Sequence, residues 1–77
     1  MSHNGTQEKL VRMANQIAGF MASRPEAEQL EGLSGHINDF WAPSMRRVLL
    51  ELIASGDENL HPLVRRASAL IRPVAAA

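Results

Sequence analysis

The stretch from His36 to Arg47 constrains the fold of this chain more than any other. It holds the only tryptophan, Trp41, one of the two phenylalanines, Phe40, and the helix-breaking residue Pro43. Proline has no N–H and disfavours helical geometry in the residue before it. Pro43 should therefore end one helix at about Ala42 and stand at the first position of the next. The sequence predicts a corner between two helices here.

Apolar residues on both sides of this corner have helical spacing. Three of them precede the corner and three follow it: Ile37, Phe40, Trp41, Met45, Val48 and Leu49. Within each group the residues lie three and four positions apart, so they share one helix face. We expect these side chains to form the centre of the core, with Phe40 buried. Trp41 lies at the edge of its face and is either a core residue or an anchor for a partner protein.

The rest of the chain also predicts helices and no strands. The expected helical ranges are about 7–23, 25–42, 43–55 and 60–72. Thr6 is a candidate N-cap of the first helix, Asp57 or Asn59 of the last, and Gly56 is a stop signal. No segment alternates apolar and polar residues with the period of a strand.

Two glycines leave the second helix open to two interpretations. Gly32 and Gly35 each cost about 1 kcal/mol relative to alanine in a helix. Either they permit the close approach of helix 7–23 or of a partner, or the helix is broken near Ser34. The predicted fold is all-α, a small bundle of four short helices, or three if the second is broken. It forms one domain over residues 1–77, with its core at about 7–73.

The first helix has more apolar surface than a small core requires. At 100° per residue its apolar side chains fill an arc of roughly 200°, whereas a core-facing stripe needs about 100°. Part of that arc should face something else. The opposite side is polar and carries Glu8, Arg12, Asn15, Gln16 and Gly19. It is either a solvated face or a polar docking surface beside the extra apolar strip.

Charge and composition exclude several classes of function. Five acids and three bases precede Pro43, and five bases and three acids follow it. The basic half is too weakly charged for a nucleic-acid binder, so we expect a protein partner. The chain has no cysteine, which fits a reducing cytoplasm. It also shows no secretion signal and no apolar run long enough to span a membrane.

The sequence does not predict catalysis by this chain alone. His36 and Asp39 lie three apart on one helix face, but a metal site needs a third ligand and none is evident. His61 precedes a proline and is better explained as a helix-entry residue than as a catalytic base. No nucleophile motif, phosphate-binding loop or paired carboxylates are present. We therefore expect no catalytic, cofactor-binding or metal-binding residue.

Two arginine pairs could serve either of two purposes. Arg46 and Arg47, and likewise Arg65 and Arg66, are neighbours on a helix, so one member of each pair must face away from the core. They either form salt bridges with the acids of the second helix or offer bidentate contacts to carboxylates of a partner.

Three segments resemble a known family: 9–17, 36–46 and 60–65. The first contains the run Arg-Met-Ala-Asn-Gln, and the second reads His-Ile-Asn-x-Phe-Trp-x-Pro-x-Met-Arg. Their combination is specific, although each run alone is not. Together they resemble the delta subunit of soluble, NAD-dependent, molybdenum-containing formate dehydrogenases. The resemblance extends from Lys9 to Pro73 and is weakest over 26–35.

The resemblance implies a non-catalytic accessory subunit of a bacterial cytoplasmic complex, which supports the assembly or stability of the catalytic (alpha) subunit. In such complexes the other subunits carry molybdenum bound to two pterin guanine dinucleotides, iron–sulfur clusters and FMN, and the delta subunit carries none of them. The motif residues that we expect to contact a partner are Arg12, Asn15, Gln16, His36, Asn38, Trp41 and Arg46. The alternative is an independent small helical adaptor or regulator that binds another protein.

Overall fold

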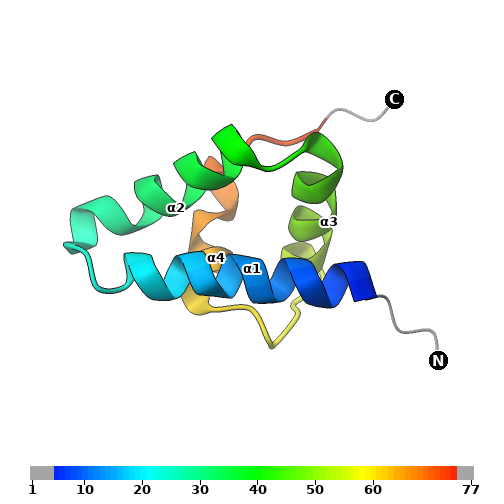
Figure 1. Cartoon of the computed structure of the whole chain (residues 1–77), viewed down its shortest axis with the longest axis horizontal. Coiled ribbons are helices and arrows are strands. Elements are labelled where there is room, and N and C mark those ends of the chain that lie inside the picture. Colours follow the sequence, from blue (N-terminus) through cyan, green and yellow to red (C-terminus); the bar gives the residue numbers. More distant parts are fainter. Residues whose placement is uncertain (1–4, 75–77) are drawn as a thin grey trace.

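The computed structural model describes residues 5–74, and residues 1–4 and 75–77 lie outside the described part. Its elements are α1 (Gly5–Met21), α2 (Glu26–Phe40), α3 (Pro43–Ala54), α4 (Pro62–Arg66) and a 3-10 helix, η1 (Ala67–Leu70). In Figure 1, α1 and α2 converge at the loop that joins them, α3 closes the wide end of the resulting triangle, and α4 lies behind. Within residues 5–74 there is no strand. The predicted all-α bundle of four helices is confirmed.

The corner predicted at Pro43 is present. Pro43 is the first residue of α3, and Ala42 before it has extended backbone angles (φ −62°, ψ 152°). Trp41, the C-cap of α2, is also extended (φ −91°, ψ 135°). The other predicted stop is confirmed as well, because Gly56 follows α3 with a φ of +79°, a left-handed conformation that favours glycine.

Two predicted N-caps are wrong. α1 begins at Gly5, so Thr6 lies inside its first turn. α4 is capped by His61, whose Nδ1 atom accepts a hydrogen bond from the Leu63 N–H at 3.0 Å. Pro62 occupies the first helical position, which fixes the cap at the residue immediately before it. This confirms His61 as a helix-entry residue.

α2 is continuous, so the interpretation with a break near Ser34 is wrong. The Met21 side chain of α1 occupies the space that a Cβ atom on Gly32 would need. The contact at this glycine is therefore with a flexible side chain of α1 and not with the α1 backbone. Gly35 is different, since a Cβ atom there would meet nothing within 4 Å.

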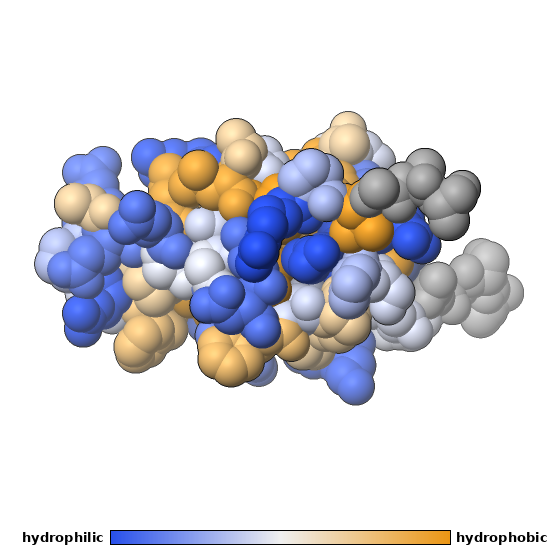
Figure 2. All heavy atoms as spheres, turned by 90° about the horizontal axis from the view of Figure 1, so that it is seen from above, coloured by the Kyte–Doolittle hydropathy of each residue, from blue (hydrophilic) through white to orange (hydrophobic). Residues whose placement is uncertain are grey.

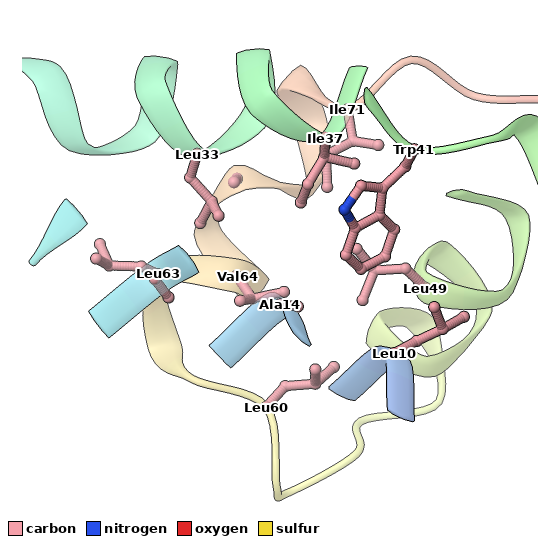
Figure 3. Packing of buried hydrophobic residues seen from close by; sticks show 12 residues of the cluster. Leu10, Ala14, Leu33, Ile37, Trp41, Leu49, Leu60, Leu63, Val64 and Ile71 are labelled. Atoms are coloured by element: carbon pink, nitrogen blue, oxygen red, sulfur yellow. The ribbon is translucent and has the colours of Figure 1, made fainter. Parts of the chain in front are cut away.

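The core lies where the helices of the triangle meet α4 and η1. Its buried apolar residues are Leu10, Ala14, Ala18, Leu33, Ile37, Trp41, Leu49, Leu60, Leu63, Val64, Ala67 and Ile71. Figure 3 shows the indole of Trp41 pointing into this cluster, toward Leu49 of α3. Ile37 and Leu49 are buried as predicted, and Trp41 takes the core position of its two alternatives. Met45 and Val48 pack against the cluster and are only partly buried.

The prediction that Phe40 is buried is wrong, because 74% of the residue is exposed. Phe40 ends α2 at the end far from the α1–α2 loop, where the two helices have diverged (Figure 1). Helical spacing places Phe40 close to the direction of Leu33, but α1 no longer covers that flank. Trp41 leaves helical geometry and turns its ring into the core, while only 5% of it stays exposed.

The last predicted helix, 60–72, is shorter and tighter than expected. Only Pro62–Arg66 is α-helical, and Ala67–Leu70 continues as a 3-10 helix. Leu63, Val64, Ala67 and Ile71 are buried, so this short segment still supplies one side of the core. We call residues 60–72 the C-terminal arm.

Candidate docking surface

Of the three exposed large hydrophobic residues in residues 5–74, two lie beside the hollow between α1 and α2 or next to a residue that lines it. Phe20 is 65% exposed and Phe40 is 74% exposed. A shallow hollow of about 450 Å³ lies between the two helices, with Phe20 at its wall. We define the apolar strip as six residues, three from each helix: Ile17, Phe20 and Met21 of α1, and Gly32, His36 and Phe40 of α2.

The narrow core stripe of α1 explains why this strip is left uncovered. Only Leu10, Ala14 and Ala18 of α1 are fully buried. The two alanines allow other elements to pack closely against α1, but these three residues cover only part of its apolar arc. Ile17 and Met21 are therefore half-buried on one flank, and Phe20 projects from it. The prediction that part of the arc faces away from the core is confirmed.

His36 connects Phe40 to the hollow. His36 lines the hollow, and its ring centroid lies 4.9 Å from that of Phe40, with the planes tilted by 39°. The two residues are one helical turn apart, so their rings meet on the surface of α2. Figure 2, which looks onto the molecule from the α2 side, shows apolar groups on both sides of a polar band.

A second, polar groove lies on the other side of α1. Its volume is about 660 Å³, and its lining includes Arg12, Asn15 and Gln16 of α1 and Asp57 and Asn59 of the loop before α4. Gln16 also lines the apolar hollow. The polar groove thus brings together three of the residues that the sequence predicts as partner contacts, Arg12, Asn15 and Gln16, whereas His36 lines the apolar hollow.

Asn15 has a structural use within this groove. Its Nδ2 atom donates to the Asn59 carbonyl at 2.7 Å, and its Oδ1 atom accepts from the His61 N–H at 2.8 Å. One amide side chain therefore satisfies a donor and an acceptor of a backbone 44 residues away. This fixes the start of the C-terminal arm against α1.

Asn38 makes the matching contact at the other end of the arm. Its Nδ2 atom donates to the Leu70 carbonyl at 3.0 Å, and its Oδ1 atom accepts from the Arg72 N–H at 2.8 Å. Arg72 adds a hydrogen bond from Nη2 to the Asn38 carbonyl at 3.3 Å. We call Asn15 and Asn38 the two asparagine clamps. Helical periodicity does not predict either clamp. Asparagine has a poor helix propensity, however, so an asparagine inside a helix suggests that its side chain has a structural use.

The other two predicted contact residues lie near the corner. Trp41 is buried and so offers a partner little surface. Arg46 in the first turns of α3 is half-buried, and its Nε atom is the one buried side-chain polar atom in residues 5–74 that lacks a hydrogen-bond partner. A buried donor without an acceptor costs roughly 1–3 kcal/mol. Whether any of the seven predicted residues contacts a partner stays a prediction.

The arginine pairs do not form the salt bridges that were one interpretation of them. Within the described residues the ion pairs are Arg24–Glu28 at 3.0 Å and Arg72–Asp39 at 3.8 Å. Arg65 instead donates from Nη2 to the Asp57 carbonyl at 2.8 Å, which braces the loop before α4. An exposed ion pair is worth under about 1 kcal/mol, so the two that form add little to stability.

The described residues do not bring together a constellation for metal binding. Across residues 5–74, no group of three or more His, Asp or Glu side chains is arranged to hold a metal ion. None of the helices in this range has the length and apolar character needed to cross a membrane. The site that the structure does build is a pair of grooves flanking α1, one apolar and one polar.

Comparison with known families places both sequence motifs inside one match. The family described as "NADH-dependant formate dehydrogenase delta subunit FdsD" matches residues 9–68 of the 77-residue chain. The matched range covers α2, α3 and α4 in full and most of α1. A search of curated proteins returned no match. The resemblance inferred from the motifs is confirmed.

Proposed function

The chain belongs to the family of NADH-dependent formate dehydrogenase delta subunits, and from that premise we propose a non-catalytic accessory role in the complex. It supports the assembly or stability of the catalytic (alpha) subunit through contacts between protein surfaces. The observation that carries the proposal is the apolar strip, because an 8.4 kDa chain that leaves Phe20 and Phe40 exposed gains by covering them.

The proposal assigns the cofactors to the other subunits of a cytoplasmic complex. These are molybdenum bound to two pterin guanine dinucleotides, where formate oxidation would take place, together with FMN and iron–sulfur clusters. The absence of cysteine from the sequence supports this assignment, because iron–sulfur clusters are held by cysteine thiolates. The accessory subunit then acts by mass action, since a protein that binds only the assembled state stabilises that state.

Deletion of this chain from its host tests the proposal. We expect the remaining subunits to give less intact complex on size-exclusion chromatography and less formate-dependent NAD reduction per cell, and re-expression of the chain should restore both. The control is the purified chain alone, which should reduce no NAD with formate. An unchanged elution profile with full activity per molybdenum would contradict an accessory role.

A further inference from the structure

We propose that the apolar strip binds one amphipathic helix of another subunit of the complex, a helix whose apolar face is edged by lysine or arginine. The inference rests on the proposed function, because it takes the occupant from the same complex. It goes further by assigning the surface and the chemistry of what covers it.

The shape of the strip fits a helix. Two helices that run side by side leave a groove between them, and a third helix can lay its apolar face into such a groove. The hollow beside Phe20 is about 450 Å³, and its lining residues Phe20, Met21 and Gly32 also line a neighbouring hollow of about 570 Å³. At Gly32 the Met21 side chain reaches across to α2, so these two residues form the floor where the strip is narrowest.

The exposed aromatic rings stand at intervals along the strip. Phe20 lines both hollows, and Phe40 extends the strip beyond His36 through their ring contact. Aromatic side chains, phenylalanine included, are enriched in protein interfaces relative to the rest of the protein surface. A partner helix that presents leucine, isoleucine or methionine would cover both rings.

The charge at the rim of the strip specifies the edge of the partner helix. The four charged residues of α2 are all acids: Glu26, Glu28, Glu31 and Asp39. Glu28 is balanced by Arg24, and Asp39 lies within 3.8 Å of Arg72. Glu31 lines the second hollow and forms no ion pair within residues 5–74. A basic side chain on the partner would supply the missing counter-charge.

The same charges argue against a second copy of this chain as the occupant. A two-fold interface brings the same surface of each subunit into contact with itself. The strip would then place α2, whose Glu26 and Glu31 have no ion pair within residues 5–74, beside another α2. Like charges facing each other disfavour that arrangement, whereas a basic partner helix is favoured by the same field.

Competition inside the complex tests this inference. A wild-type chain and a variant, with different tags, are expressed together in the host with the remaining subunits, and their ratio is measured in the purified complex. The test variants are Phe20→Ala, Phe40→Ala and Glu31→Lys. The matched controls are Leu70→Ala, the third exposed large hydrophobic residue, and Glu51→Lys, an exposed acid on α3.

We expect each phenylalanine variant to enter the complex at least about tenfold less often than the wild type, and Glu31→Lys about three- to tenfold less often. Both controls should compete as equals. All the altered side chains are exposed, so circular dichroism of the purified variants should show unchanged helix content.

The outcomes separate this inference from the proposed function. If all three test variants compete as well as the controls while the wild-type chain still co-purifies with the complex, the strip is not the docking surface. If Glu31→Lys alone competes as an equal, the basic edge is wrong. A purified chain that forms a dimer, and that Phe20→Ala turns into a monomer, would make a second copy the occupant. A wild-type chain that co-purifies with no formate dehydrogenase subunit would instead overturn the proposed function.

Discussion

Phe40 and Trp41 are neighbours with opposite environments, and the difference arises from backbone geometry at a single residue. Had α2 continued one residue further, the two rings would have pointed about 100° apart on the helix surface. The extended conformation of Trp41 takes it out of that register and sends the indole toward Leu49. Periodicity reports the direction in which a side chain points, but not what covers it there. The sequence therefore located the corner correctly and assigned the buried aromatic residue wrongly.

The two residues should respond in opposite ways to truncation. Trp41→Ala should lower the free energy of unfolding of the isolated chain by about 3–5 kcal/mol, because it removes a large side chain from the core. Phe40→Ala should change it by less than about 0.5 kcal/mol, because the residue is exposed. Urea unfolding followed by circular dichroism measures both values. Equal losses for the two variants would contradict the buried position of Trp41.

At the scale of elements, the C-terminal arm is the part that the sequence predicted least well. α1, α2 and α3 have long apolar patterns and clear boundary signals, and their observed ends lie within about two residues of the expected ones. α4 has five residues, too few to form a stable helix without tertiary contacts. Its position depends on the two asparagine clamps, which act over 44 and 32 residues of sequence. No local pattern can encode such a contact.

Removal of the first clamp should therefore loosen the arm. Asn15→Ala leaves the Asn59 carbonyl and the His61 N–H without their partner, which should lower the free energy of unfolding by about 1–3 kcal/mol. Asn15→Asp keeps the acceptor for His61 but turns a second acceptor toward the Asn59 carbonyl, so it should also lower the free energy of unfolding. Gln16→Ala, at the exposed neighbouring position, is the control. Hydrogen exchange should show faster exchange of the His61 amide in Asn15→Ala, and protection equal to the wild type would rule out the clamp.

For the whole molecule, the candidate site could be predicted in part. The wide apolar arc of α1 indicated that one helix has surface to spare, and the polar motif residues of α1 do share a groove. The strip itself was missed. Phe20 lines the hollow and Phe40 is joined to it through the His36 ring, an arrangement that exists only once α1 and α2 lie at their observed angle (Figure 1). Exposure is a property of the complete arrangement of helices.

The small thickness of the molecule should affect how fast the free chain is degraded in the cell. Its extents are 39 × 28 × 20 Å, and the shortest of these holds only two layers of helices of about 10–12 Å diameter. A body only two helices thick has few buried contacts that oppose local opening. Local opening exposes backbone that proteases can cleave. We expect proteases to remove the free chain quickly and to spare the chain in the complex. After protein synthesis is blocked, its half-life should be several-fold shorter in a host that lacks the other subunits. The amount of this chain would then stay matched to the amount of the other subunits without any control of transcription.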